Sequence, residues 1–132
     1  MAEAVTIARP YAEAAFRLAR EKNTLAQWSR MLALLELVVK DEQVERCIGD
    51  PNVSNRQLES LVLGVCGEQL DGPGRNFVQA LVDNDRLAMV PEIRVLFEDL
   101  KRKHEGILEA QIYSAFALDK EQQSRLVRRL ES

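Results

Sequence analysis

The residues that could support catalysis are few and lie far apart along the chain. His104 is the only histidine, and Cys47 and Cys66 are the only cysteines. An acid–base pair or a thiol nucleophile needs a second ionisable group held beside it, and the sequence nominates none. We therefore predict that His104 belongs to a basic turn that closes a helix, that both thiols are reduced core residues, and that the chain is not an enzyme.

Motifs for nucleotides, metals and nucleic acids are also missing. The turn Gly72-Pro73-Gly74 is not followed by the Gly-Lys-Ser/Thr of a phosphate-binding loop, and the two cysteines lack metal-ligand spacing. Basic residues cluster at 101–104 and 125–129, but the formal net charge of −3 is opposite to that of a typical nucleic-acid binder. We expect no cofactor, no metal and no nucleic-acid partner.

Composition indicates a helical protein with an aliphatic core. The chain has 132 residues, of which 46% are hydrophobic and only 5% aromatic. This length is sufficient for one buried core, and the core must come mainly from Leu, Val, Ile and Ala. No apolar run approaches the roughly 20 residues of a membrane-spanning helix.

Apolar residues recur at helical spacing through most of the chain. Thr24 with Gln27, and Ser54 with Gln57, have the spacing of capping boxes. Asp41 is expected to cap the short third helix, and Pro10 is expected in the first turn of its helix. The six predicted helices cover residues 6–22, 25–39, 42–48, 55–66, 75–83 and 91–105.

The pattern changes after Gly106. Apolar residues alternate with polar ones from Leu108 to Ser114, which predicts a strand, and Asp119 with Gln122 predicts the start of a last helix. The predicted fold is thus an all-α six-helix bundle, residues 1–105, followed by a short strand–helix stub, residues 106–132, from an incomplete second domain.

The first and fifth predicted helices each carry two apolar stripes, although a surface helix needs only one. Either both helices pack on two sides, or a surplus stripe forms a groove for a partner helix. The sequence alone does not assign which stripe faces the core. The paired stripes are Ile7, Tyr11, Ala14 and Leu18 beside Ala8, Ala12, Ala15 and Ala19, and Phe77 with Leu81 beside Val78 with Val82.

Several motifs, in order along nearly the whole chain, resemble the delta (OSCP) subunits of F1Fo ATP synthases. No single motif is specific, but their combined order and spacing are. They are Ala-Arg-Pro-Tyr-Ala at 8–12 with Phe16, Trp28, Met31-Leu32, the stretch 65–70, Asn76-Phe77-Val78 with Leu81, Asn84 and Arg86-Leu87, Pro91-Glu92-Ile93, Ser114-Ala115 and Leu118.

This resemblance implies a non-catalytic protein of the peripheral stalk, or stator. In that family the helical domain receives the N-terminal helix of an alpha subunit in a groove between helices one and five. The matching positions nominate apolar contact residues, with the alanines allowing close approach. The nominated residues are Tyr11, Ala12, Ala15, Phe16, Phe77, Val78 and Leu81.

The resemblance further implies that the C-terminal part contacts the b subunits, so that proton-driven rotation is coupled to ATP synthesis. Family members continue beyond the last residue of this chain, which leaves binding of b subunits by residues 106–132 in question. The expected location is the cytoplasmic face of the bacterial inner membrane, held there by partners. The alternatives are a helical regulatory or dimerisation module, and a helical nucleic-acid-binding domain.

Overall fold

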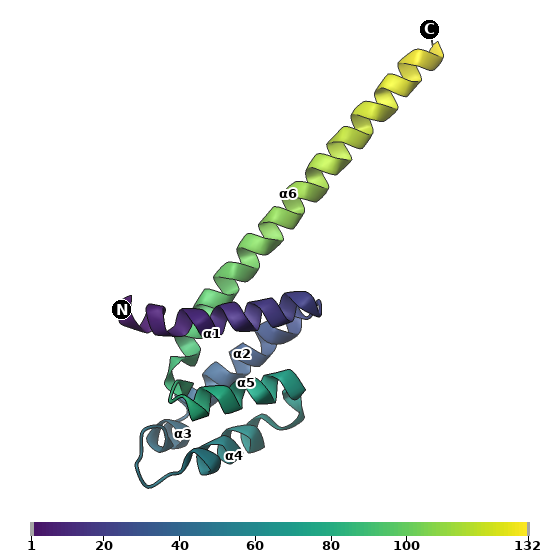
Figure 1. Cartoon of the computed structure of the whole chain (residues 1–132). Coiled ribbons are helices and arrows are strands. Elements are labelled where there is room, and N and C mark those ends of the chain that lie inside the picture. Colours follow the sequence, from purple (N-terminus) through teal and green to yellow (C-terminus); the bar gives the residue numbers. More distant parts are fainter. Residues whose placement is uncertain (1, 132) are drawn as a thin grey trace. The chain divides into compact units, whose positions relative to one another are not determined.

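The computed structural model describes the backbone of residues 2–131 and the side chains of residues 3–117. The described residues form α-helices joined by short 3-10 turns and contain no strand, so the all-α prediction is confirmed (Figure 1). The elements are α1 (Ala2–Glu21), α2 (Leu25–Lys40), α3 (Glu42–Cys47), α4 (Asn55–Cys66), η1 (Gly67–Gln69), α5 (Gly72–Asp83), η2 (Leu87–Met89) and α6 (Val90–Glu131).

The chain divides into two compact units, Met1–Leu100 and Lys101–Ser132. The first unit contains α1 to α5 and the first residues of α6. Within it, α2 packs against α1, α3 and α4, and α4 lies beside α5 (Figure 1). The predicted functional division at residue 105 stays a prediction.

Helix α1 begins earlier than its sequence pattern suggests. It starts at Ala2, so Pro10 lies in the interior of the helix, and the prediction that Pro10 lies in the first turn is wrong. Proline in a helix interior removes one hydrogen bond to the preceding turn and usually bends or destabilises the helix. Here Pro10 is exposed, and the four buried alanines described below hold the helix on the bundle.

The predicted caps have mixed outcomes. Ser54 and Gln57 form the complete capping box of α4, and the Asp41 carboxylate accepts a hydrogen bond from the backbone N–H of Gln43 at the start of α3. Thr24 makes no side-chain cap at α2, so that capping-box prediction is wrong. Its expected partner, Gln27, instead donates to the Asp71 carboxylate at 2.7 Å, because α5 places a better acceptor beside it.

Asp71 also begins α5. Its carboxylate accepts a hydrogen bond from the backbone N–H of Gly74 at 2.7 Å, while its other oxygen holds Gln27 of α2. Gly74 suits this close approach, because an added Cβ would lie 2.7 Å from the sulfur of Met31 and the methionine side chain would have to shift. One side chain therefore starts α5 and ties it to α2.

The core lies where these helices meet and contains no buried polar side chain among the described residues. Small residues face it from α1, and larger ones from α2, α5 and α6. Its largest fully buried side chains are Phe97, Leu32, Leu35, Leu81, Leu87, Ile93, Val62, Val78, Val82, Val90 and Cys66.

The predicted C-terminal stub is wrong in its strand. Helix α6 continues through Gly106 and through the segment Leu108–Ser114. Glu109, Ala110 and Gln111 are strong helix formers, and one glycine costs a helix only about 1 kcal/mol relative to alanine. A lone strand has no partner for its backbone groups, whereas a helix satisfies them internally.

The sequence also predicted two helix ends in this region. The expected stop before Gly106 is wrong, since the helix passes through it. The expected new start at Asp119 and Gln122 is absent from the backbone, which is part of α6, and these two side chains lie outside the described ones. Among the described residues, no helix combines the length and apolar character needed to cross a membrane.

Candidate functional site

The structure separates the two apolar stripes of α1. Ala8, Ala12, Ala15 and Ala19 are all completely buried. They face the core, and α1 packs there against α2 and η2. Methyl side chains let two helix backbones approach closely, so this stripe attaches α1 to its own domain. The alanine stripe is therefore structural within the isolated chain.

The other stripe of α1 is only partly covered. Ile7, Tyr11 and Ala14 are half-buried, and Leu18 is 40% exposed. These residues follow one another at intervals of four, three and four, so they form a continuous apolar face about three turns long. We call these four residues the α1 outer stripe.

Phe16 stands at the opposite edge of the alanine stripe. Its ring packs edge-on against Phe97 of α6, with centroids 6.3 Å apart, and the Arg20 guanidinium lies 5.6 Å from the centre of the same ring. An aromatic pair and a cation over a partly exposed ring each contribute modestly to stability. Phe16 thus joins α1 to α6 while part of its ring stays accessible.

Both stripes of α5 face inward. Val78 and Leu81 are fully buried, and Phe77 is 7% exposed, with its ring edge-on to Trp28 at 5.4 Å between centroids. The exposed residues of α5 are polar or small, among them Asn76 and Gln79. The interpretation in which α5 packs on two sides therefore describes this helix.

The seven nominated contact residues differ in how far their side chains are buried. Tyr11 and Phe16 are half-buried on α1. The other five lie in the core of the first unit: Ala12, Ala15, Phe77, Val78 and Leu81. Their role in binding a partner stays a prediction. Ile7, Ala14 and Leu18 were visible as a stripe in the sequence but were not nominated, because the resemblance pointed to other positions.

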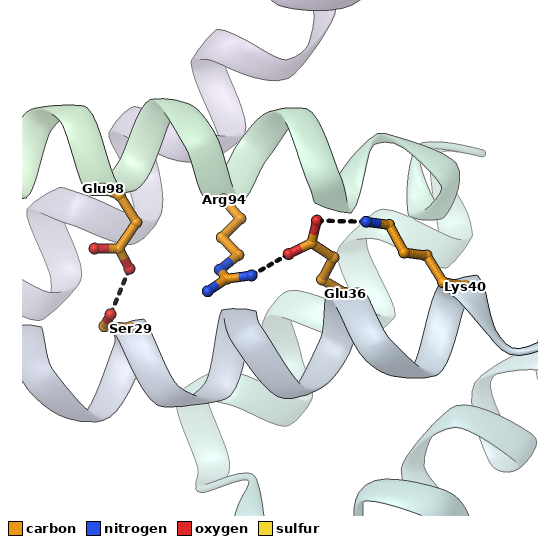
Figure 2. Close-up of polar contacts among 5 residues, drawn as sticks. All are labelled: Ser29, Glu36, Lys40, Arg94 and Glu98. Carbon is orange, nitrogen blue, oxygen red and sulfur yellow. Dashed lines mark hydrogen bonds and ion pairs between the residues drawn. The ribbon is translucent and has the colours of Figure 1, made fainter.

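Polar contacts that sequence reasoning missed hold α6 on α2 (Figure 2). Arg94 donates to the Glu36 carboxylate, which also accepts from Lys40 at 2.9 Å, and the Ser29 hydroxyl donates to Glu98. The hydrogen bond from Arg94, followed by that from Lys40, holds the pKa of Glu36 below its usual value. The signal in the sequence was Glu36, a charged residue within the apolar pattern of α2, which indicates a charged partner on another helix.

The residues considered for catalysis lie in unsuitable surroundings. Cys66 is 1% exposed, and burial raises the pKa of its thiol, which opposes formation of a nucleophilic thiolate. Cys47 is half-buried and forms no disulfide. Among the described side chains, no three His, Cys, Asp or Glu residues gather as a metal site would require.

The second unit exposes a separate apolar face on α6. Leu108, Ile112 and Phe116 are spaced four residues apart and are 42%, 68% and 57% exposed. Ile107 and Tyr113, on either side of them, are also exposed. Large apolar side chains gathered on one helix face often mark an interaction surface.

Comparison with known proteins agrees with these features. Residues 7–132 match the sequence model of the family described as ATP synthase delta (OSCP) subunit. Proteins named ATP synthase subunit delta are 49% identical in Nitrosospira multiformis, 47% in Nitrosomonas europaea and 48% in Dechloromonas aromatica. Each alignment covers all of this chain and 74% of the relative. The chain therefore belongs to the ATP synthase delta (OSCP) subunit family.

Proposed function

We propose that this chain is a non-catalytic stator subunit that connects the alpha/beta head of F1 to the b-subunit stalk. In this role it resists rotation of the head, so that proton-driven rotation is coupled to ATP synthesis. The single observation that carries the proposal is the half-exposed outer stripe of α1 in a chain of this family. A partly exposed apolar stripe at helical spacing suits an amphipathic partner helix.

The proposed partner is the N-terminal helix of an alpha subunit, in a groove between α1 and α5. Tyr11 and Phe16 would contact the partner directly, together with Ile7, Ala14 and Leu18. The buried members of the nominated set would support the groove from beneath: Ala12, Ala15, Phe77, Val78 and Leu81. The roles are apolar anchoring on the surface and rigid packing below it.

We further propose that the exposed face of α6 around Ile112 contributes to contact with the b subunits. Leu108, Ile112 and Phe116 supply apolar area of the kind that helical partners bury. The chain would then lie at the cytoplasmic face of the membrane, attached to it through its partners.

Calorimetric titration with a peptide that copies the first ~20 residues of the cognate alpha subunit tests the proposal, since about 20 residues make a helix of five to six turns. One peptide should bind per chain. Leu18→Gln should weaken binding by about tenfold, because it removes apolar area from the outer stripe. Arg17→Gln is the matched control, since Arg17 is exposed and lies off that stripe.

The absence of binding by a folded chain would overturn the proposed contact, and equal losses in the two variants would place it elsewhere. The alternative of a dimerisation module uses the same stripe, because two copies could cover it mutually. Light scattering over a range of concentrations separates these readings. A tight dimer that excludes the peptide would favour the alternative.

A further inference from the structure

The first unit contains a cleft away from the outer stripe, and no residue of α1 lines it. It has a volume of about 390 Å³, and its walls come from the end of α3, the connection to α4, the start of α4 and the turn after α5. This volume is at the lower end of the range for sites that bind small molecules or a few side chains. A ligand bound in this cleft would therefore not occupy the proposed alpha-subunit contact.

The floor of the cleft is apolar. Leu58 of α4, Val82 of α5 and Leu87 of η2 line it, and each is buried at 8% exposure or less. A ligand that reaches this floor gains by removing aliphatic carbon from water. The floor therefore favours an aliphatic group of the ligand.

The charged residues that line the cleft are both acidic. They are Asp50, in the connection after α3, and Asp85, in the turn after α5. Both come from distant parts of the sequence, and together they make the lining of the cleft negative.

These carboxylates are not neutralised within the part of the chain that the structure describes. Asp50 accepts a hydrogen bond from the backbone N–H of Asn52 at 2.9 Å, which leaves its charge in place. The neighbouring Arg86 donates to the backbone carbonyl of Asp85 and forms no ion pair with its carboxylate. The cleft thus combines an apolar floor with two uncompensated negative charges.

We propose that this cleft docks a short basic and apolar segment of a partner polypeptide, with an arginine or lysine beside a leucine-like residue. The cation meets Asp50 and Asp85, while the neighbouring aliphatic side chain packs over Leu58, Val82 and Leu87 at the base of the cleft. Charge complementarity selects the basic side chain, and the apolar floor selects its neighbour. A polypeptide supplies both groups at a fixed spacing.

Cys47 provides a local reporter, because its half-buried thiol lines the same cleft. The probe is a short peptide in which Arg alternates with Leu, and the matched probe has Gln in place of Arg. The rate of reaction of Cys47 with Ellman's reagent is measured on the full chain with each peptide. Cys66 serves as an internal control, because it is buried and should react slowly in every sample.

We expect the Arg peptide to slow the reaction of Cys47 at concentrations at which the Gln peptide does not. The double variant Asp50→Asn with Asp85→Asn should weaken this protection by about three- to tenfold, as expected for two exposed charge pairs. Asparagine keeps the hydrogen bond of residue 50 and tolerates the positive φ of 56° at residue 85. The variant should therefore fold normally, which circular dichroism would check.

Asp83→Asn with Glu68→Gln is the matched control, because it removes the same charge from exposed residues that do not line the cleft. Equal effects of the two double variants would overturn the proposal in favour of a general charge effect. No protection of Cys47 at millimolar peptide would also overturn it. Equal protection by benzamidine, a small organic cation, would identify a small-molecule site instead.

Discussion

Neighbouring alanines on α1 have opposite environments, although their sequence context is almost the same. Ala15 is completely buried in the core, whereas Ala14 is half-buried on the outer stripe. A large residue at position 15 would therefore disturb the fold before it could block a partner helix, because a larger side chain there has no room.

Ala15→Leu should lower the free energy of unfolding by about 1–3 kcal/mol, because it overpacks the interface of α1 with the bundle. Ala14→Leu is the matched control and should change the same quantity by about 0.5 kcal/mol or less, since its side chain can extend toward solvent. Urea denaturation followed by circular dichroism measures both. Similar losses for the two variants would contradict the assignment of stripes.

The helical spacing of Trp28 with Leu25, Leu32 and Leu35 predicts a core residue, and its 2% exposure confirms this. Its emission should therefore be shifted to the blue of free tryptophan. Phe77→Ala should lower the free energy of unfolding by about 3–5 kcal/mol and shift the emission of Trp28 to the red, because it removes the ring packed against the indole. Leu37→Ala is the control, as Leu37 is 71% exposed.

At the scale of single elements, the capping box of α4 makes a direct prediction. Ser54→Ala should lower the free energy of unfolding by about 1 kcal/mol, because the backbone N–H of Gln57 loses its acceptor. Ser60→Ala places the same change at an exposed position within α4, where no cap exists. It should leave stability unchanged or raise it slightly. Thermal or urea unfolding of both variants checks the difference.

The contact between α2 and α6 predicts a dependence on pH. Glu36 has a lowered pKa in the folded chain, so its ionised form stabilises the fold at pH values above its ordinary pKa of 4.5. That contribution disappears as the pH falls through the lower, folded-state pKa. Glu36→Gln should therefore reduce the free energy of unfolding at pH 7 by about 1 kcal/mol, since the contact with Arg94 is partly exposed to solvent.

The same substitution should have little effect at a pH low enough to protonate Glu36 in the wild-type chain. Urea titrations of both proteins across this range measure the difference. Glu13→Gln is a control at an exposed site on α1. A constant difference between wild type and Glu36→Gln at every pH would show that lost packing, and not charge, causes the effect.

At the scale of the whole molecule, the first unit should fold without the second. The core residues of the first unit all lie before Leu100, with Phe97 the last of them. A fragment of residues 1–100 should therefore unfold cooperatively, with a midpoint close to that of the full chain. It should also bind the alpha-subunit peptide with similar affinity. Loss of cooperative unfolding would show that residues 101–132 are needed for the fold.

The sequence predicted most helices because the signals for a helix are local. Apolar spacing, the Ser54 capping box and the Asp41 cap act within one or two turns, and they appear as expected. The same local signals gave a wrong prediction at Leu108–Ser114, where the alternating pattern predicts a strand and the structure has a helix. The neighbouring helix formers and the missing strand partner favour the continuation of α6 instead.

The candidate site could be predicted only in part, for a related reason. The sequence marked both stripes of α1 and both stripes of α5 as apolar, and its motifs identified the family. Periodicity does not say which neighbour covers a stripe. Position in the bundle decides that Ala15 is buried while Leu18 stays accessible, and that α5 turns both of its stripes inward.

Contacts between distant residues were beyond any local pattern. Gln27 and Asp71 are 44 positions apart, and Glu36 and Arg94 are 58 apart, so only the packing of whole helices could bring them together. The same holds for the acidic cleft, which unites Asp50 and Asp85. The sequence by itself determined most of the helices, the caps at Asp41 and Ser54, and the family. The tertiary structure decided which faces are free to bind, because the burial of a side chain depends on residues from distant parts of the sequence that pack against it.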